Sequence, residues 1–141
     1  MTTATETKTL KFSLVAALAL GASLDGGDYA GITTLSDGRP VAIVHLGLTL
    51  ASDHAGCVKY AEEHDAEIAS RAVFHTLRAT IKDKLPKEGW CWTADTLDQD
   101  TGKKADASYA WLCYFRNGLT STSHKSYERQ AVVVRLIPLE A

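Results

Sequence analysis

The feature that most constrains this chain is an aromatic-rich stretch over residues 89–135, near the C-terminal end of the sequence. All three tryptophans and three of the five tyrosines lie in it. Large aromatic side chains bury more area than most others and dominate the core of a small domain. We therefore predict that this stretch forms the core, with Trp90, Trp92 and Trp111 buried, and that the rest of the chain packs on it.

The length of 141 residues and the formal net charge of −2 are typical of a single globular domain. Residues 1–8 are polar and threonine-rich, so we expect a flexible tail followed by one domain over residues 9–141. A nucleic-acid-binding domain would show a clustered basic excess, which this chain lacks. A membrane-spanning helix needs about 20 apolar residues in a row. The sequence therefore predicts neither a nucleic-acid partner nor a membrane partner.

Residues 9–20 allow two interpretations. Lys8 and Lys11 flank the start of an apolar run that ends in Ala-Leu-Gly-Ala (residues 19–22), which is the outline of a secretory signal peptide. Glu6 lies in the region that would have to be positive, however, and the apolar run is short. We favour a first strand or helix of the fold over a cleaved signal.

Alternating and β-branched runs bounded by glycine-rich turns predict strands. A turn over residues 36–40 joins the first two strands into a hairpin, and the dipeptide Asn117-Gly118 is a strong hairpin signal later in the chain. The predicted strands cover residues 29–34, 41–46, 108–115 and 131–139. The polar segment of residues 93–106 reads as a loop.

Two helices are predicted between the strands. The first has Ser52 or Asp53 as its N-cap and turns Ala61, together with Cys57 or Val58, toward the core. The second has Ser70 as its N-cap and ends at Pro86. Its apolar residues at helical spacing are Val73, Phe74, Leu77, Ile81 and Leu85. Its other face carries Arg71, Arg78, Lys82 and Lys84, which we interpret as a solvated surface.

The polar and reactive residues do not form a recognisable catalytic or metal-binding motif. The three cysteines include no CxxC pair, so we expect reduced thiols, as in a cytoplasmic protein. The five histidines include no i, i+4 pair, and the aspartates of residues 95–106 lack the spacing of a calcium-binding loop. Neither a nucleophile elbow nor a phosphate-binding loop is present. We expect no cofactor, no metal and no enzymatic activity.

An ordered set of motifs runs through residues 21–137. It comprises Gly-Gly-x-Tyr-Ala-Gly from Gly26, Trp-x-Trp-Thr from Trp90, Ala-Trp-x-x-x-Phe-x-x-Gly from Ala110, Lys-Ser-x-Glu-Arg from Lys125 and a final Val-Arg. In this order the chain resembles the Lcl C-terminal domain family, which occurs in bacterial surface proteins and in tailed phages and prophages. It departs from the family pattern at Ile68-Ala69-Ser70, at Gly56-Cys57 and at Val73, where family members tend to carry Leu-Pro-Thr, Trp and Glu.

The resemblance implies an α+β, C-type lectin-like fold, in which the N- and C-terminal strands pair and two helices flank small antiparallel sheets with long loops. It also implies that residues 93–107 and 116–130 carry binding. Tyr and Arg are enriched at interface hot spots. The candidate ligand- or partner-binding residues are Asp98, Asp100, Lys103, Lys104, Tyr114, Arg116, Asn117, His124, Lys125, Tyr127 and Arg129.

The function implied is that of a phage- or prophage-encoded, non-catalytic binding module, associated with the virion or tail, that recognises a protein or a glycan. The alternative is an intracellular phage protein that inhibits a host protein complex, for example a defence complex, by direct binding. We expect it in the host cytoplasm during infection or on the virion. Both a monomer and a homo-oligomer are compatible with the sequence.

Overall fold

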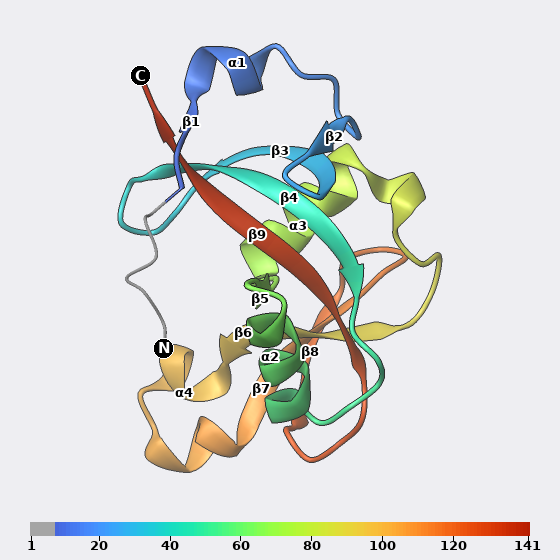
Figure 1. Cartoon of the computed structure of the whole chain (residues 1–141). Helices are drawn as coiled ribbons and strands as arrows, with labels where there is room; N and C mark the ends of the chain where they lie inside the picture. Colours follow the sequence, from blue (N-terminus) through green and yellow to red (C-terminus); the bar gives the residue numbers. More distant parts are fainter. Residues whose placement is uncertain (1–7) are drawn as a thin grey trace.

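The computed structural model describes residues 8–141 and shows a mixed α+β architecture built on a large, mostly antiparallel open sheet (Figure 1). The strand order is β2-β3-β4-β9-β6-β7-β8, and β1 and β5 also pair with β9. The strands are β1 (Leu10–Lys11), β2 (Ser23–Leu24), β3 (Gly27–Thr34), β4 (Pro40–Leu48), β5 (Glu67–Ile68), β6 (Trp90–Thr96), β7 (Tyr109–Tyr114), β8 (Thr120–His124) and β9 (Gln130–Glu140).

The centre of the sheet is β9, which crosses the middle of the molecule in Figure 1. It pairs antiparallel with β4 and β5 and parallel with β1 and β6. Its run of four consecutive buried residues, Ala131 to Val134, is typical of a strand that is covered on both faces. The pairing of β1 with β9 confirms the expectation that N- and C-terminal strands lie side by side.

The helices α2 (His54–Glu63) and α3 (Arg71–Thr80) cover different parts of the core. Asp53 caps α2 by accepting from the Gly56 N–H, and Ser70 caps α3 by accepting from the Val73 N–H, as the sequence predicts. One cluster packs α3 against Val132 and Val134, and a second packs α2 against Ala131 and Val133. The alternation of side chains along β9 therefore serves both clusters.

The predicted N-terminal element contains both a strand and a helix. After β1 the chain forms α1 (Phe12–Ala16), whose Val15 is buried against Tyr29 and Ala42. Lys8 forms an ion pair with Asp25, and the rest of the predicted flexible tail, residues 1–7, lies outside the described residues. The β3–β4 hairpin also forms as predicted, and residues 9–20 are the first ordered element that we favoured.

The prediction that the second helix ends at Pro86 is wrong. Helix α3 ends at Thr80, because Ile81 leaves helical geometry with φ −133° and ψ 39°, and a short 3₁₀ turn follows at η1 (Lys82–Lys84). Ile81 and Leu85 are nevertheless buried, so the predicted apolar stripe is correct although its last members are not helical.

The prediction of a loop over residues 93–106 is also wrong. Strand β6 continues to Thr96, and the segment then forms α4 (Leu97–Thr101) and the 3₁₀ helix η2 (Lys104–Ser108). The polar stretch after Asn117-Gly118 contains β8, which completes the predicted hairpin with β7. Strand β6 extends into this segment with help from a residue distant in sequence, since the Ala94 N–H donates to Ala69 O.

The tryptophans are not equally buried. Trp92 is 1% exposed, which confirms its place in the core, whereas Trp90 and Trp111 are half-buried. The core also contains residues of β3, β4 and α3, so residues 89–135 supply part of it rather than all.

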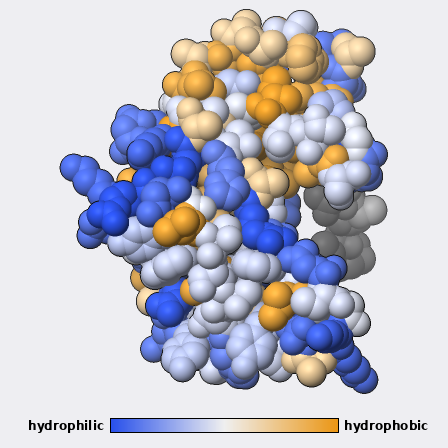
Figure 2. Space-filling model, turned by 180° about the vertical axis from the view of Figure 1, so that it is seen from behind, coloured by the Kyte–Doolittle hydropathy of each residue, from blue (hydrophilic) through white to orange (hydrophobic). Residues whose placement is uncertain are grey.

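Exposed hydrophobic residues gather at the end of the molecule that carries α1, as Figure 2 shows; they include Phe12, Leu14 and Leu20. Within residues 8–141, no helix has the length and hydrophobicity to cross a membrane.

Candidate functional site

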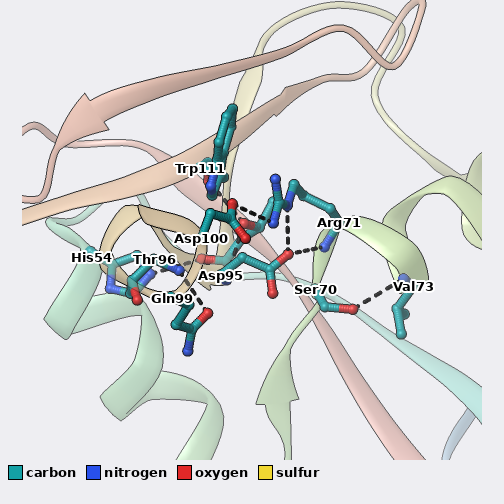
Figure 3. Close-up of polar contacts among 10 residues, drawn as sticks. His54, Ser70, Arg71, Val73, Asp95, Thr96, Gln99, Asp100 and Trp111 are labelled. Carbon is teal, nitrogen blue, oxygen red and sulfur yellow. Dashed lines mark hydrogen bonds and ion pairs between the residues drawn. The ribbon is translucent and has the colours of Figure 1, made fainter. Parts of the chain in front are cut away.

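Four elements meet at Arg71, the first residue of α3. Its backbone N–H and its Nε both donate to Asp95 Oδ2, at 2.8 and 2.9 Å, and its Nη2 donates to Asp100 Oδ2 at 2.9 Å. Its guanidinium carbon lies 4.4 Å from the ring centroid of Trp111. Figure 3 shows these side chains converging from α3, β6, α4 and β7. We call Arg71, Asp95, Asp100 and Trp111 the Arg71 cluster.

Local sequence signals place the parts of this cluster. Ser70 Oγ caps α3 by accepting from the Val73 N–H, and the Asp95 carboxylate accepts from the Arg71 N–H in the same first turn. The negative charge of Asp95 also interacts favourably with the positive end of the helix dipole. Helix α4 begins after Thr96, whose N–H donates to Gln99 Oε1 at 3.1 Å. It ends at Gly102, whose φ of 70° favours glycine. Asp100 is thereby held on a short helix that faces Arg71.

The charged groups of the Arg71 cluster are paired with one another but remain accessible to solvent. The side chains of Arg71, Asp95 and Asp100 are 29%, 24% and 41% exposed. Partial burial lowers the pKa of Arg71, but its hydrogen bonds and charge interactions with Asp95 and Asp100 outweigh this effect and raise the pKa above its usual value. The guanidinium is therefore a permanent cation over the Trp111 ring, which is a cation–π contact.

The outer strands β7 and β8 continue this surface as an aromatic face, which we define as Tyr109, Trp111, Thr122 and His124. Tyr109 lies opposite His124 in the sheet and Trp111 opposite Thr122, so these side chains point to one side. The rings of Tyr109 and His124 meet edge to face at 5.4 Å, and Tyr109 is 39% exposed. Within residues 8–141, Trp111 Nε1 has no hydrogen-bond partner. The surface combines aromatic rings, a cation and carboxylates.

The predicted binding residues fall into separate groups. Asp98 and Asp100 lie on α4, and Lys103 and Lys104 lie at the start of η2. A second group lies at the β7–β8 turn and a third beyond the other end of β8. The second group is Tyr114, Arg116 and Asn117; the third is His124, Lys125, Tyr127 and Arg129.

The structure joins some of these residues and separates others. Asp100 meets Arg71, and Arg116 lies 5.7 Å from the ring centroid of Tyr114. The register of β7 with β8 puts the turn group beside Thr120 and the third group beside His124, at opposite ends of the strand. The eleven residues therefore do not form one continuous patch.

The predicted binding residues include Asp100 and His124 of this surface but not its other five residues. The sequence places Arg71 on a solvated helix face and Trp111 in the core, and it gives no binding role to Tyr109. The alternation along Tyr109-Ala-Trp111 indicates that both rings share a face, but the partner of Arg71 lies 24 residues away in sequence. Arg78 also differs from the predicted solvated face, since its Nε donates to Phe115 O at 3.0 Å.

The cysteines are poor candidates for nucleophiles. All three are free and buried, and Cys91 lies directly opposite Cys113 in the β6–β7 pair. Burial raises the pKa of Cys113 to about 12 and also raises the pKa of Cys91 and of Cys57. The reactive form of cysteine is the thiolate, which burial disfavours at neutral pH.

Three of the four loop aspartates that could bind a cation are engaged within the chain, whereas Asp98 Oδ1 has no hydrogen-bond partner within residues 8–141. Asp95 and Asp100 accept from Arg71, and Asp106 accepts from Thr101 Oγ1 at 2.7 Å. Over residues 8–141, no group of three or more His, Cys, Asp or Glu side chains is arranged to hold a metal ion.

Comparison with known proteins finds no matching family model, no matching curated protein and no matching solved structure. The resemblance to the Lcl C-terminal domain family accordingly stays a prediction from the ordered motifs.

Proposed function

We propose that this chain is a non-catalytic binding module that recognises a protein or a glycan through the Arg71 cluster and the adjoining aromatic face. The observation that carries the proposal is the stacking of Arg71 on Trp111 at 4.4 Å, next to the exposed rings of Tyr109 and His124. Trp, Tyr and Arg are the residues that most often dominate binding energy at interfaces.

Preorganisation supports the same proposal. Side chains that are already fixed lose less conformational entropy when a partner binds. Arg71 is fixed by three hydrogen bonds and by the Trp111 ring, and Tyr109 is fixed by its edge contact with His124.

In its finer form, the proposal is a phage- or prophage-encoded protein with a C-type lectin-like fold, carried on the virion or tail. This form is supported by the order of motifs from Gly26 to Arg135, which resembles the Lcl C-terminal domain family. The alternative, an intracellular inhibitor of a host protein complex, would use the same surface. The two forms differ in the partner that they bind and in their location, which is the virion for the first and the host cytoplasm for the second.

The test is affinity capture from infected-cell lysate, with a glycan array in parallel, using the wild-type chain and a Tyr109→Ala, His124→Ala variant. Both substitutions remove exposed rings, so the variant should stay folded. Leu14→Ser, in the hydrophobic end over α1, is the matched control. The proposal expects a partner that wild type and control retain and the aromatic variant loses. A partner retained equally by all three chains would place binding elsewhere.

A further inference from the structure

The sheet ends at β8, and the outward backbone groups of this strand can be identified from its hydrogen bonds. The Tyr114 N–H donates to Leu119 O, and the Lys125 N–H donates to Ser108 O, each at 2.8 Å. The two bonds lie directly before and directly after β8. In an antiparallel pair, residues that bond to the neighbouring strand alternate with residues whose N–H and C=O point away from it.

The register then assigns every residue between these ends. Ser121 and Ser123 lie at even spacing from Leu119, so they bond inward to β7. The N–H and C=O groups of Thr120 and Thr122, and the N–H of His124, point outward along the edge of the sheet. The C=O of His124 already accepts from the Tyr127 N–H at 3.1 Å.

Strand β8 lacks the features that usually prevent an edge strand from pairing with another chain. Natural edge strands carry lysine or proline, are very short, or are interrupted by bulges. Residues 120–124 are Thr-Ser-Thr-Ser-His, without lysine, proline or a formal charge at pH 7, and their register with β7 is continuous. The opposite edge strand, β2, has only two residues. Strand β8 is therefore suited to pairing with another strand.

Exposed apolar side chains accompany the open edge at both of its ends. Leu119 is 60% exposed at one end, and Tyr127, at 61%, follows the other. Association with another chain would bury both these apolar side chains and the unpaired backbone groups beside them.

We propose that β8 pairs antiparallel with β8 of a second copy of this chain, about a two-fold axis at Thr122. In that register Thr122 faces its own counterpart, Thr120 faces His124, and Ser121 faces Ser123. All of these contacts are between small or neutral side chains, and cross-strand Thr pairs are favourable. A two-fold interface must be self-complementary, and this strand meets the condition.

The strand ends match as well. Leu119 of one copy lies opposite Lys125 of the other, whose alkyl stem can cover it while the ammonium group stays in water.

The arrangement has a consequence for recognition. The two-fold axis of an antiparallel strand pair stands perpendicular to the sheet, so both copies turn their aromatic faces to the same side. The dimer would present two copies of the proposed binding surface, which raises avidity for a repeated or multivalent partner. The pairing itself uses the backbone edge and does not depend on the aromatic face being a binding site.

The first experiment is sedimentation equilibrium from about 10 µM to about 1 mM, since a small interface implies a weak dimer. The wild-type mass should rise from 15.2 kDa toward twice that value. Thr122→Pro should stay monomeric, because it removes an outward N–H and leaves the β7 pairing intact. Thr122→Val keeps the N–H and the β-branched shape, so it should dimerise like wild type.

The second experiment covers the case in which Thr122→Pro fails to fold. In wild-type hydrogen exchange, the Thr122 and His124 amides should become protected as concentration rises, because they face the outward C=O groups of Thr122 and Thr120 of the second copy. The Ser121 and Ser123 amides should be protected at every concentration. A constant monomer mass would overturn the proposal. So would a dimer that forms while the Thr122 and His124 amides exchange at an unchanged rate, because another surface would then hold the copies together.

Discussion

Arg71 donates two hydrogen bonds to one oxygen of Asp95, from its backbone N–H at 2.8 Å and from its Nε at 2.9 Å. The two residues lie 24 positions apart in sequence, so this contact ties the start of α3 to the end of β6. It also aims the guanidinium at Trp111. Asp95 Oδ2 thus fixes the position of Arg71 in the surface that we propose for binding.

Asp95→Ala should lower the free energy of unfolding by about 1–2 kcal/mol, because it removes a charged acceptor of two hydrogen bonds that are partly shielded from water. Chemical denaturation measures the change. The control is Asp83→Ala, an exposed carboxylate in η1, which should change stability by less than about 0.5 kcal/mol. Equal effects of the two substitutions would contradict a special role for Asp95.

The two tryptophans Trp92 and Trp111 should differ in their effect on stability. Trp92→Ala should cost about 3–5 kcal/mol, since the ring is 1% exposed and its Nε1 donates to Ser52 O at 3.2 Å. Trp111 is half-buried, so Trp111→Ala should cost less and should mainly weaken binding. Denaturation midpoints of the two variants decide the order. A larger loss for Trp111→Ala would make that residue part of the core.

Stability should fall as the pH drops below about 6.5, the usual pKa of histidine. Burial lowers the pKa of His45 and of His54, with Asp28 opposing this effect at His45 and the Thr93 carbonyl opposing it at His54. Lys84 near His45 and Lys125 near His54 lower the pKa further, whereas Asp53 raises that of His54. At these two histidines the unfolded chain therefore binds more protons than the folded chain, and protonation favours unfolding. Burial raises the pKa of Glu67, which acts in the opposite direction at the acidic end of the range.

The measurement for this prediction is the melting temperature between about pH 7.5 and pH 5.5, above the range in which most carboxylates titrate. His54→Gln should flatten the dependence on pH relative to wild type. His64→Gln, an exposed histidine that follows α2, is the matched control. A wild-type melting temperature that stays constant over this interval would contradict the assignment of the buried histidines.

The three cysteines should be unreactive in the folded protein, because all are buried and burial raises their pKa values. Titration with a chromophoric disulfide reagent should count no fast-reacting thiol in native protein and three thiols after denaturation. Fast reaction of one native thiol would reveal an accessible cysteine and would reopen the question of cysteine chemistry.

The parts of the fold that were predictable are those set by local chemistry. Ser70 and Asp53 cap their helices through bonds to residues three positions ahead, which any helix start of this kind makes. The strands of the β3–β4 hairpin and β9 follow from apolar and β-branched runs. The stop at Thr80 was missed because the apolar stripe continues through Ile81 and Leu85 without helical backbone.

The parts that were not predictable depend on partners distant in sequence. Strand β8 carries a hydroxyl-rich sequence with no apolar alternation, and it is a strand because β7 supplies its hydrogen bonds. The candidate surface depends on Arg71 reaching Asp95 and Trp111, which lie in other elements. The sequence indicates which kinds of residue are present at this surface, and the fold determines which of them come into contact.

The measurement that tests the central claim most directly is the dissociation constant of the captured partner for the wild-type chain and for Tyr109→Ala, His124→Ala, by calorimetry. Removing two rings of a binding hot spot should weaken the affinity at least about 10-fold, with the melting temperature nearly unchanged. Equal affinities, with both chains folded, would contradict the proposal that the aromatic face beside Arg71 is the binding surface.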